Sequence, residues 1–187
     1  MGKSIGAVLL AAGVLWVWGF AYWGLNPLPY ESWKSAKDDR AAQLALLQHF
    51  PETGTYYIPS RAHSTEAQRA LLHSGPWGFV QISYAEREPF EIKTLVYGLL
   101  LNIVFAAGLA MLMYRVRSTA RTYSGRLGVP FWSGLIAVVL IDGGDVVWWN
   151  LSYNWQLYVA LYNFSAFLIA GAVLALFIKG TVRDRLA

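Results

Sequence analysis

The stretch FWSGLIAVVLIDGGDVVWW, residues 131–149, is an apolar run long enough to cross a membrane, and it carries two acids, Asp142 and Asp145. A helix rises about 1.5 Å per residue, so Asp142 lies roughly 17 Å from Phe131, near the middle of a hydrocarbon core about 30 Å thick. An ionised acid at that depth costs at least a few kcal/mol unless it faces protein, a partner or water. The two acids are therefore the first candidates for function.

The rest of the chain also has the composition of a membrane protein. Of its 187 residues, 56% are hydrophobic, and three further runs, Ile5–Trp23, Thr94–Tyr114 and Leu157–Ile178, have about the ~20 residues that cross a membrane. The first run follows Lys3, as a secretory signal would, but it is too long for one and ends in interfacial aromatic residues. The sequence predicts an all-α membrane protein with a bundle of four transmembrane helices.

The distribution of charge predicts the topology. Basic residues gather at one set of helix ends: Lys3, Arg115, Arg117, Arg121, Arg126, Lys179, Arg183 and Arg185. Residues 26–91 instead hold eight acids and six bases. The positive-inside rule then places both termini and an Arg-rich loop, residues 115–128, in the cytoplasm. We expect a bacterial inner-membrane protein whose net charge of +4 reflects topology and contact with membrane lipids, and not binding of nucleic acid.

The long segment between the first two helices is predicted to fold as a small α+β extracytoplasmic cap. The expected division is residues 1–25 for the first helix, 26–92 for the cap and 93–187 for the other three helices. Within the cap we expect a helix capped by Asp38 or Asp39, a strand over 54–58, a helix opened by Thr65 and Gln68, and a strand over 77–84. Whether the strands pair is open. So short a segment buries little core alone, so we expect it to rest on the bundle.

The intramembrane acids have amide residues at similar depth. Asp142 and Asp145 share one helical face, and counting from the outer helix ends places Asn102 and Asn163 in the same layer, roughly 6–12 Å from the outer boundary. We expect these four residues to form a polar cluster. It is either a staple that fixes helix pairing, a site for a proton or cation, or a face that meets a cationic group of another protein.

The chain has nine tryptophans, most of them near the ends of the apolar runs, and four of them suggest a second kind of site. Trp18, Trp23, Trp148 and Trp149 are predicted to lie near the outer interface. They form either an aromatic belt facing lipid or a stacking surface for a lipid-like, quinone-like or pigment ligand. The direction of the side chains distinguishes these interpretations.

Other chemistry finds little support in the sequence. The chain has no cysteine, which excludes disulfides and thiol nucleophiles. His49, His63 and His73 match no metal-ligand spacing, so we assign no metal and no catalytic residue, and the sequence identifies no cofactor. The sequence leaves enzymatic activity open but favours a protein that is not an enzyme.

Rows of small residues such as Ala106 and Ala110 allow close helix packing. The favoured function is a non-enzymatic accessory, assembly or scaffold subunit of a larger membrane complex, with other integral membrane proteins as partners.

Two resemblances agree with this layout. One helix, a large outer loop and three further helices resemble the arrangement of claudins, although the cysteine pair of that family's loop is missing. The motifs VWGF (residues 17–20) with the proline-containing stretch to Trp33, GTYYIP (54–59) and GPWGF (75–79) resemble a group of proteobacterial inner-membrane proteins with no assigned activity. This second resemblance implies a membrane location and a four-helix layout, and no mechanism.

Overall fold

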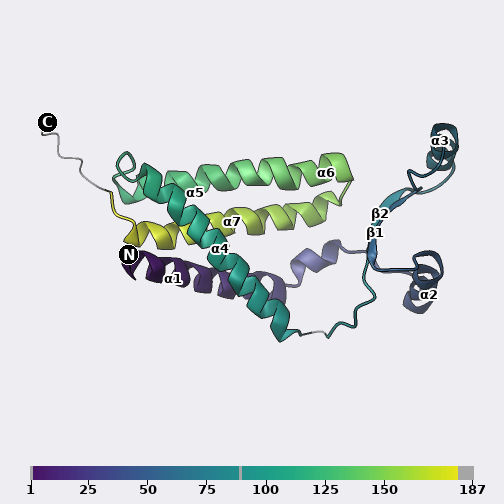
Figure 1. Ribbon diagram of the computed structural model, residues 1–187, viewed down its shortest axis with the longest axis horizontal. Coiled ribbons are helices and arrows are strands. Elements are labelled where there is room, and N and C mark those ends of the chain that lie inside the picture. The colour runs from purple at the N-terminus through teal and green to yellow at the C-terminus, as the bar shows by residue number, and fades with distance from the viewer. Residues whose placement is uncertain (1, 89, 181–187) are drawn as a thin grey trace, which may run out of the picture. The chain divides into compact units, whose positions relative to one another are not determined.

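The computed structural model describes residues 2–88 and 90–180 (Figure 1). The chain forms two compact units. The helical unit consists of the residues up to Trp33 and those from Glu91 onward, and the small unit is Lys34–Phe90.

Four helical spans of 22 to 27 residues make up most of the helical unit, and each is long and apolar enough to cross a membrane. Their elements are α1 (Gly2–Gly19) with the π-helical η1 (Phe20–Leu25), α4 (Ile92–Val116), α5 (Tyr123–Ala137) with the π-helical η3 (Val138–Asp142) and α6 (Gly143–Trp149), and α7 (Tyr153–Phe177). The short 3₁₀ helix η2 (Leu28–Ser32) follows η1. The prediction of four long apolar helices is confirmed.

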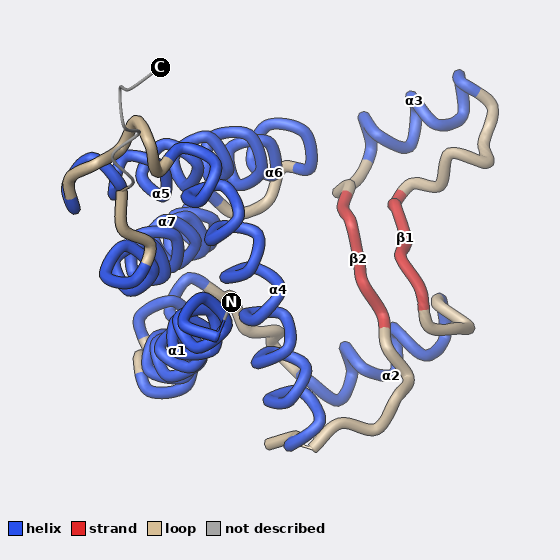
Figure 2. The backbone as a smooth tube through the Cα atoms, turned by 60° about the vertical axis from the view of Figure 1, so that its left-hand side comes forward, coloured by secondary structure: helices blue, strands red, loops and turns tan. Residues whose placement is uncertain are grey.

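Small residues occupy the centre of the helical unit. Helix α7 lies between α1 and α5, and α4 crosses this layer obliquely (Figures 1 and 2). The fully buried positions include Ala7 and Ala11 of α1, Ala106 of α4, and Ala170 and Ala175 of α7. Small side chains let helix backbones approach closely, which is how helices gain packing contacts where no water drives them together.

The contact of α5 with α7 is the tightest of these. A Cβ built on Gly171 would lie 2.2 Å from Cγ of Pro130, and one built on Gly134 would lie 2.9 Å from Cβ of Phe167. Only glycine fits at these two crossing points. The proline ring inside α5 therefore rests directly on the backbone of α7.

The end of the bundle where α1 begins and α7 ends carries the clustered arginines, and we call it the basic end. The connection between α4 and α5 is shorter than the predicted loop 115–128, because α5 begins at Tyr123, where Thr122 Oγ1 accepts the Gly125 N–H at 3.0 Å. Arg126 is consequently a buried helical residue and not a loop residue. Its Nε and Nη2 donate to Ala175 O, at 3.2 and 3.0 Å, and its Nη1 donates to Arg121 O at 2.7 Å.

The small unit contains helices α2 (Asp39–His49) and α3 (Thr65–Ser74) and strands β1 (Gly54–Ile58) and β2 (Gly78–Ile82). The strands pair in antiparallel register, with Tyr56 opposite Val80, which settles the question that the sequence left open. Asp38 caps α2 by accepting the Ala41 N–H at 3.0 Å. Ser64, and not the predicted Thr65, caps α3.

Candidate functional site

The residues around Asp142 form a distorted turn in the third span. The Gly143 N–H donates to Val138 O, five residues back, so the turn Val138–Asp142 is wider than an α-helical turn. Single π turns inside α-helices occur frequently at functional sites. This turn ends at the acid that the sequence singled out.

Asp142 is paired with an amide of α7. Asn163 Nδ2 donates to both carboxylate oxygens of Asp142, at 3.0 and 3.1 Å. Asp142 is only 4% exposed. A carboxylate has about four lone-pair sites, and the single amide nitrogen satisfies only part of that capacity. The side chain therefore has acceptor capacity left inside the protein.

Asp145 has a different partner, Gln156, which sequence reasoning missed. Gln156 Nε2 donates to Asp145 Oδ2 at 3.3 Å, and Gln156 is 4% exposed. Its Oε1 is buried and has no hydrogen-bond partner among the described residues. Gln156 escaped notice because the predicted fourth helix began at Leu157, whereas α7 begins at Tyr153. The chain turns sharply between α6 and α7 at Asn150, whose φ is 53°. This turn brings Asp145 of α6 opposite Gln156 in the first turn of α7.

Asp142 and Asn163 each line a cavity. One, of about 310 Å³, is lined by Asp142 and Gln156 together with Val138, Val139, Val146 and Leu157, and we call it the Asp142 groove. The other, of about 340 Å³, is lined by Asn163, Asn102 and mostly apolar neighbours such as Phe105. The two members of the hydrogen-bonded pair therefore line different cavities, each of which is otherwise mainly apolar.

The four predicted members of the polar cluster are thus arranged unevenly. Asp142 and Asn163 are in direct contact, and Asp145 bonds to Gln156 instead. Asn102 lines the second cavity with Asn163, and among the described residues it has no hydrogen bond to either acid. The sequence predicts a similar depth for these four residues, but it does not predict which amide bonds to which acid.

The four tryptophans named from the sequence also separate. Trp18 Nε1 donates to Ser165 Oγ at 3.0 Å. Trp23 packs within 6.5 Å, between ring centres, of four other rings: Tyr22, Tyr30, Trp155 and Tyr162. Trp148 and Trp149 are 80% and 52% exposed. The first pair is packed within this chain: Trp18 of α1 and Trp23 of η1 both contact α7. Trp148, in contrast, has the exposure expected of a residue facing lipid.

Asp142 and Asp145 have no basic partner in residues 2–88 and 90–180, which the structure describes. Among the described residues, the buried charged side chains are Asp142 and Arg126. They lie in the same span about 24 Å apart along the helix axis. Burial of an ionised carboxylate without a cation costs several kcal/mol. The site is therefore suited to take up a proton, a cation or a hydrogen-bond donor.

Comparison with family models, with curated proteins and with solved structures finds no match to this chain.

Proposed function

We propose that this chain is a non-enzymatic integral protein of the bacterial inner membrane that serves as an accessory, assembly or scaffold subunit of a larger membrane complex. The four apolar spans and the arginines of the basic end support a membrane-spanning chain with both termini in the cytoplasm. The small unit, Lys34–Phe90, then lies on the outer side.

The observation that carries this proposal is the incomplete chemistry of the Asp142 groove. Within the part of the chain that the structure describes, Gln156 Oε1 is a buried acceptor without a donor and Asp142 is a buried acid without a cationic partner. Unsatisfied groups of this kind cost about 1–3 kcal/mol each or more, so a protein keeps them where something else completes them. A side chain of a neighbouring protein is suited to that role.

The walls of the groove make it accessible from the side of the bundle. Val139 and Leu157 line it and are 65% and 46% exposed. A transmembrane helix of a partner that carries a lysine, an arginine or an amide donor at the depth of Asp142 matches both the apolar walls and the two acceptors. The partner helix would then recognise this chain by one polar contact, at Asp142, within an otherwise apolar interface.

A photo-cross-linking residue in place of Val139 tests the proposal in intact cells. We expect one discrete adduct with a second membrane protein, and a weaker adduct when Asp142 is changed to Leu. The same residue at Val147 is the control, because Val147 is 71% exposed on α6 but does not line the groove. A chain that gives no adduct from position 139 and purifies as a monomer in mild detergent would contradict the proposal.

A second function, uptake of a proton or cation at Asp142, is supported by the two cavities that Asp142 and its partner Asn163 line. The sequence of the four spans argues against a complete conduction path, because Asp142 and Asp145 are the only acids in them. A path across a membrane needs polar groups over about 30 Å. Asparagine substitutions at the two acids separate this function from the first.

A further inference from the structure

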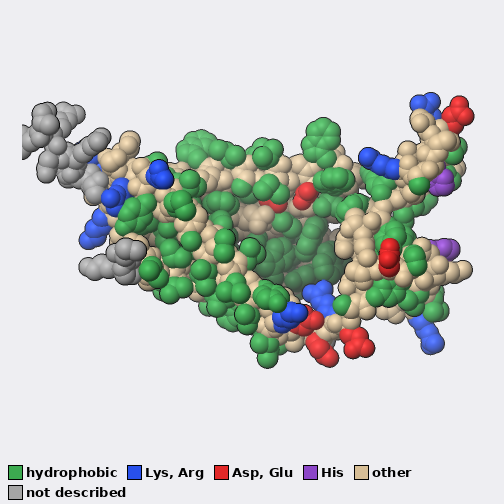
Figure 3. Space-filling model, in the orientation of Figure 1, with side chains coloured by type: hydrophobic (Ala, Val, Ile, Leu, Met, Phe, Trp, Pro, Cys, Tyr) green, Lys and Arg blue, Asp and Glu red, His purple; other side chains and the backbone are tan. Residues whose placement is uncertain are grey.

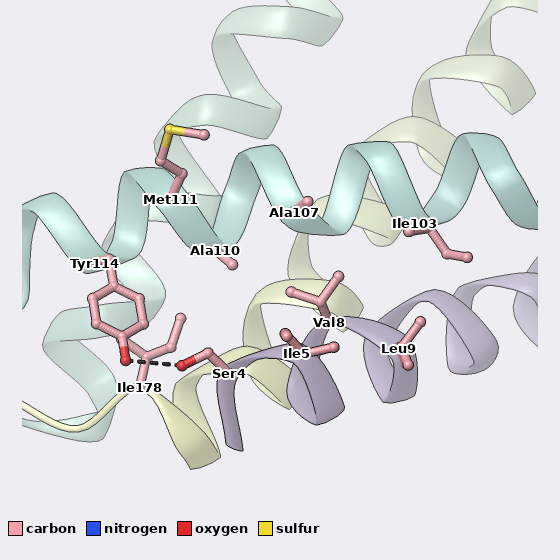
Figure 4. A pocket seen from close by; sticks show the side chains of 10 residues that line it. All are labelled: Ser4, Ile5, Val8, Leu9, Ile103, Ala107, Ala110, Met111, Tyr114 and Ile178. Atoms are coloured by element: carbon pink, nitrogen blue, oxygen red, sulfur yellow. Dashed lines mark hydrogen bonds between the residues drawn. The ribbon is translucent and has the colours of Figure 1, made fainter. Parts of the chain in front are cut away.

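A second groove lies between α1 and α4, at the basic end of the helical unit. It has a volume of about 580 Å³, within the range of roughly 300–1,000 Å³ typical of small-molecule sites. Its walls are apolar and come from both helices: Ile5, Val8 and Leu9 of α1, and Ile103, Ala107 and Met111 of α4. In Figure 4, Ile5, Val8 and Leu9 project into the space between the two helices.

One end of this groove is polar. Ser4 Oγ and Tyr114 OH are hydrogen-bonded at 3.0 Å and close the end nearest the start of α1 (Figure 4). The guanidinium carbon of Arg117 lies 4.5 Å from the centre of the Tyr114 ring. Two hydroxyl groups thus line the polar end of the groove, and a guanidinium lies against the ring of the tyrosine that carries one of them.

The length of the groove matches one leaflet of a membrane. Its α4 residues run from Ile103 to Tyr114, which is about 16 Å along the helix axis. Half of a hydrocarbon core about 30 Å thick is close to that distance. A groove of this length accommodates an acyl chain that extends from the membrane surface toward the midplane.

The charge near this polar end selects the headgroup. Residues 115–126 contain four arginines and no acid, so no carboxylate of this segment neutralises Arg117. Lys and Arg side chains gather at this end of the helical unit, and hydrophobic side chains cover much of the visible face beside them (Figure 3). Basic residues at the cytoplasmic ends of helices attract anionic lipid headgroups.

We propose that the groove between α1 and α4 binds an anionic phospholipid. One acyl chain lies along Val8, Leu9 and Ile103. The phosphate accepts hydrogen bonds from the Arg117 guanidinium and from the one hydroxyl of the Ser4–Tyr114 pair that does not donate to the other. This proposal requires that the chain spans a membrane, but it is independent of the accessory role and of the Asp142 groove.

Native mass spectrometry of the detergent-purified protein, with added phosphatidylglycerol or phosphatidylcholine, tests the binding. We expect one phosphatidylglycerol to remain bound and to bind more tightly than phosphatidylcholine. Arg117→Gln should weaken phosphatidylglycerol binding about fivefold, since a basic residue near the membrane surface contributes ~1 kcal/mol. Lys93→Gln is the matched control, because Lys93 stacks over Tyr97 near the start of the same helix, away from this groove.

A second pair of variants tests the apolar part. Ala107→Trp fills the groove and should abolish retention of the lipid. Val104→Trp, at a position that is 70% exposed and outside the groove, should leave it unchanged. Equal binding of the two lipids, equal effects of the two tryptophans, or a second copy of the chain in place of the lipid would overturn the proposal.

Discussion

Gly171 of α7 lies directly against the ring of Pro130 of α5, so closely that a Cβ on Gly171 would come within 2.2 Å of the ring. We expect Gly171→Ala to destabilise the protein, because the rigid ring cannot move aside without separating the helices. Overpacking of this kind costs typically about 1–3 kcal/mol. Thermal unfolding in detergent, followed by circular dichroism, measures the loss.

Gly108 provides the control for that substitution. It lies inside α4, and a Cβ there would meet nothing within 4 Å. Gly108→Ala should raise stability by up to ~1 kcal/mol, because alanine is the better helix former. If both alanine variants unfolded at the same temperature, the tight α5–α7 contact would be refuted.

Arg126 is expected to contribute strongly to stability, since its guanidinium donates to the main-chain oxygens of Ala175 and Arg121. The last carbonyls of a helix have no partner within the helix, and Ala175 lies in the last turn of α7. Arg126→Leu should cost about 2–3 kcal/mol, and Arg126→Lys less. Arg115→Leu, at an exposed position, should change the unfolding temperature little. Equal effects of the two leucine variants would contradict the capping role.

Asp142 distinguishes a structural staple from an ion site. Asp142→Asn keeps an acceptor for Asn163 Nδ2 and should leave the fold and expression intact. Asp142→Leu removes the acceptor and should destabilise by about 1–3 kcal/mol, because it leaves the Asn163 amide unpaired. Thermal unfolding of the two variants checks this order of stability.

The same asparagine substitution tests ion uptake. If Asp142 binds a proton or cation, Asp142→Asn should abolish that uptake in reconstituted vesicles, whereas Asp145→Asn should be tolerated. The reason is that Asp145 is less buried than Asp142 and bonds to a different amide. Unchanged behaviour of both variants in cells and in vesicles would remove support for the ion site.

The proposed topology is testable with single cysteines, since the chain has none of its own. Ser35 of the small unit and Ser118 at the basic end are both exposed. Ser35→Cys should react with an impermeant maleimide on intact spheroplasts, and Ser118→Cys only after permeabilisation. The reverse pattern would place the small unit in the cytoplasm.

Several features of the fold follow from local sequence signals. The four apolar runs gave the long helices, and glycine and proline at Gly54 and Pro59 bounded the first strand within a residue. Depth within a span also follows from counting residues: the count places Asn163 level with Asp142, and the two side chains are hydrogen-bonded. All of these features can be read from the order and spacing of residues along the chain.

The features that sequence reasoning missed depend on rotation about that axis and on neighbours distant in the chain. Asn102 has a depth similar to that of Asn163, yet α4 presents it to a cavity and not to an acid. Arg126 carries a charge typical of a loop, but the carbonyls of α7 hold it inside a helix. Gln156 is a polar residue at the edge of an apolar run, so hydropathy does not assign it to the helix. Its contact with Asp145 depends on the turn between α6 and α7.

The wide turn at Val138–Asp142 has a consequence for the helical phase of the whole third span. In an uninterrupted α-helix, each residue advances about 100°, so Asp142 would be rotated about 120° from Pro130. A π turn accommodates one extra residue, which reduces that rotation to about 20°. Pro130 and Asp142 can therefore both face α7, one pressing on Gly171 and the other bonding to Asn163. A single local irregularity keeps a tight steric contact and a polar contact in phase along one helix.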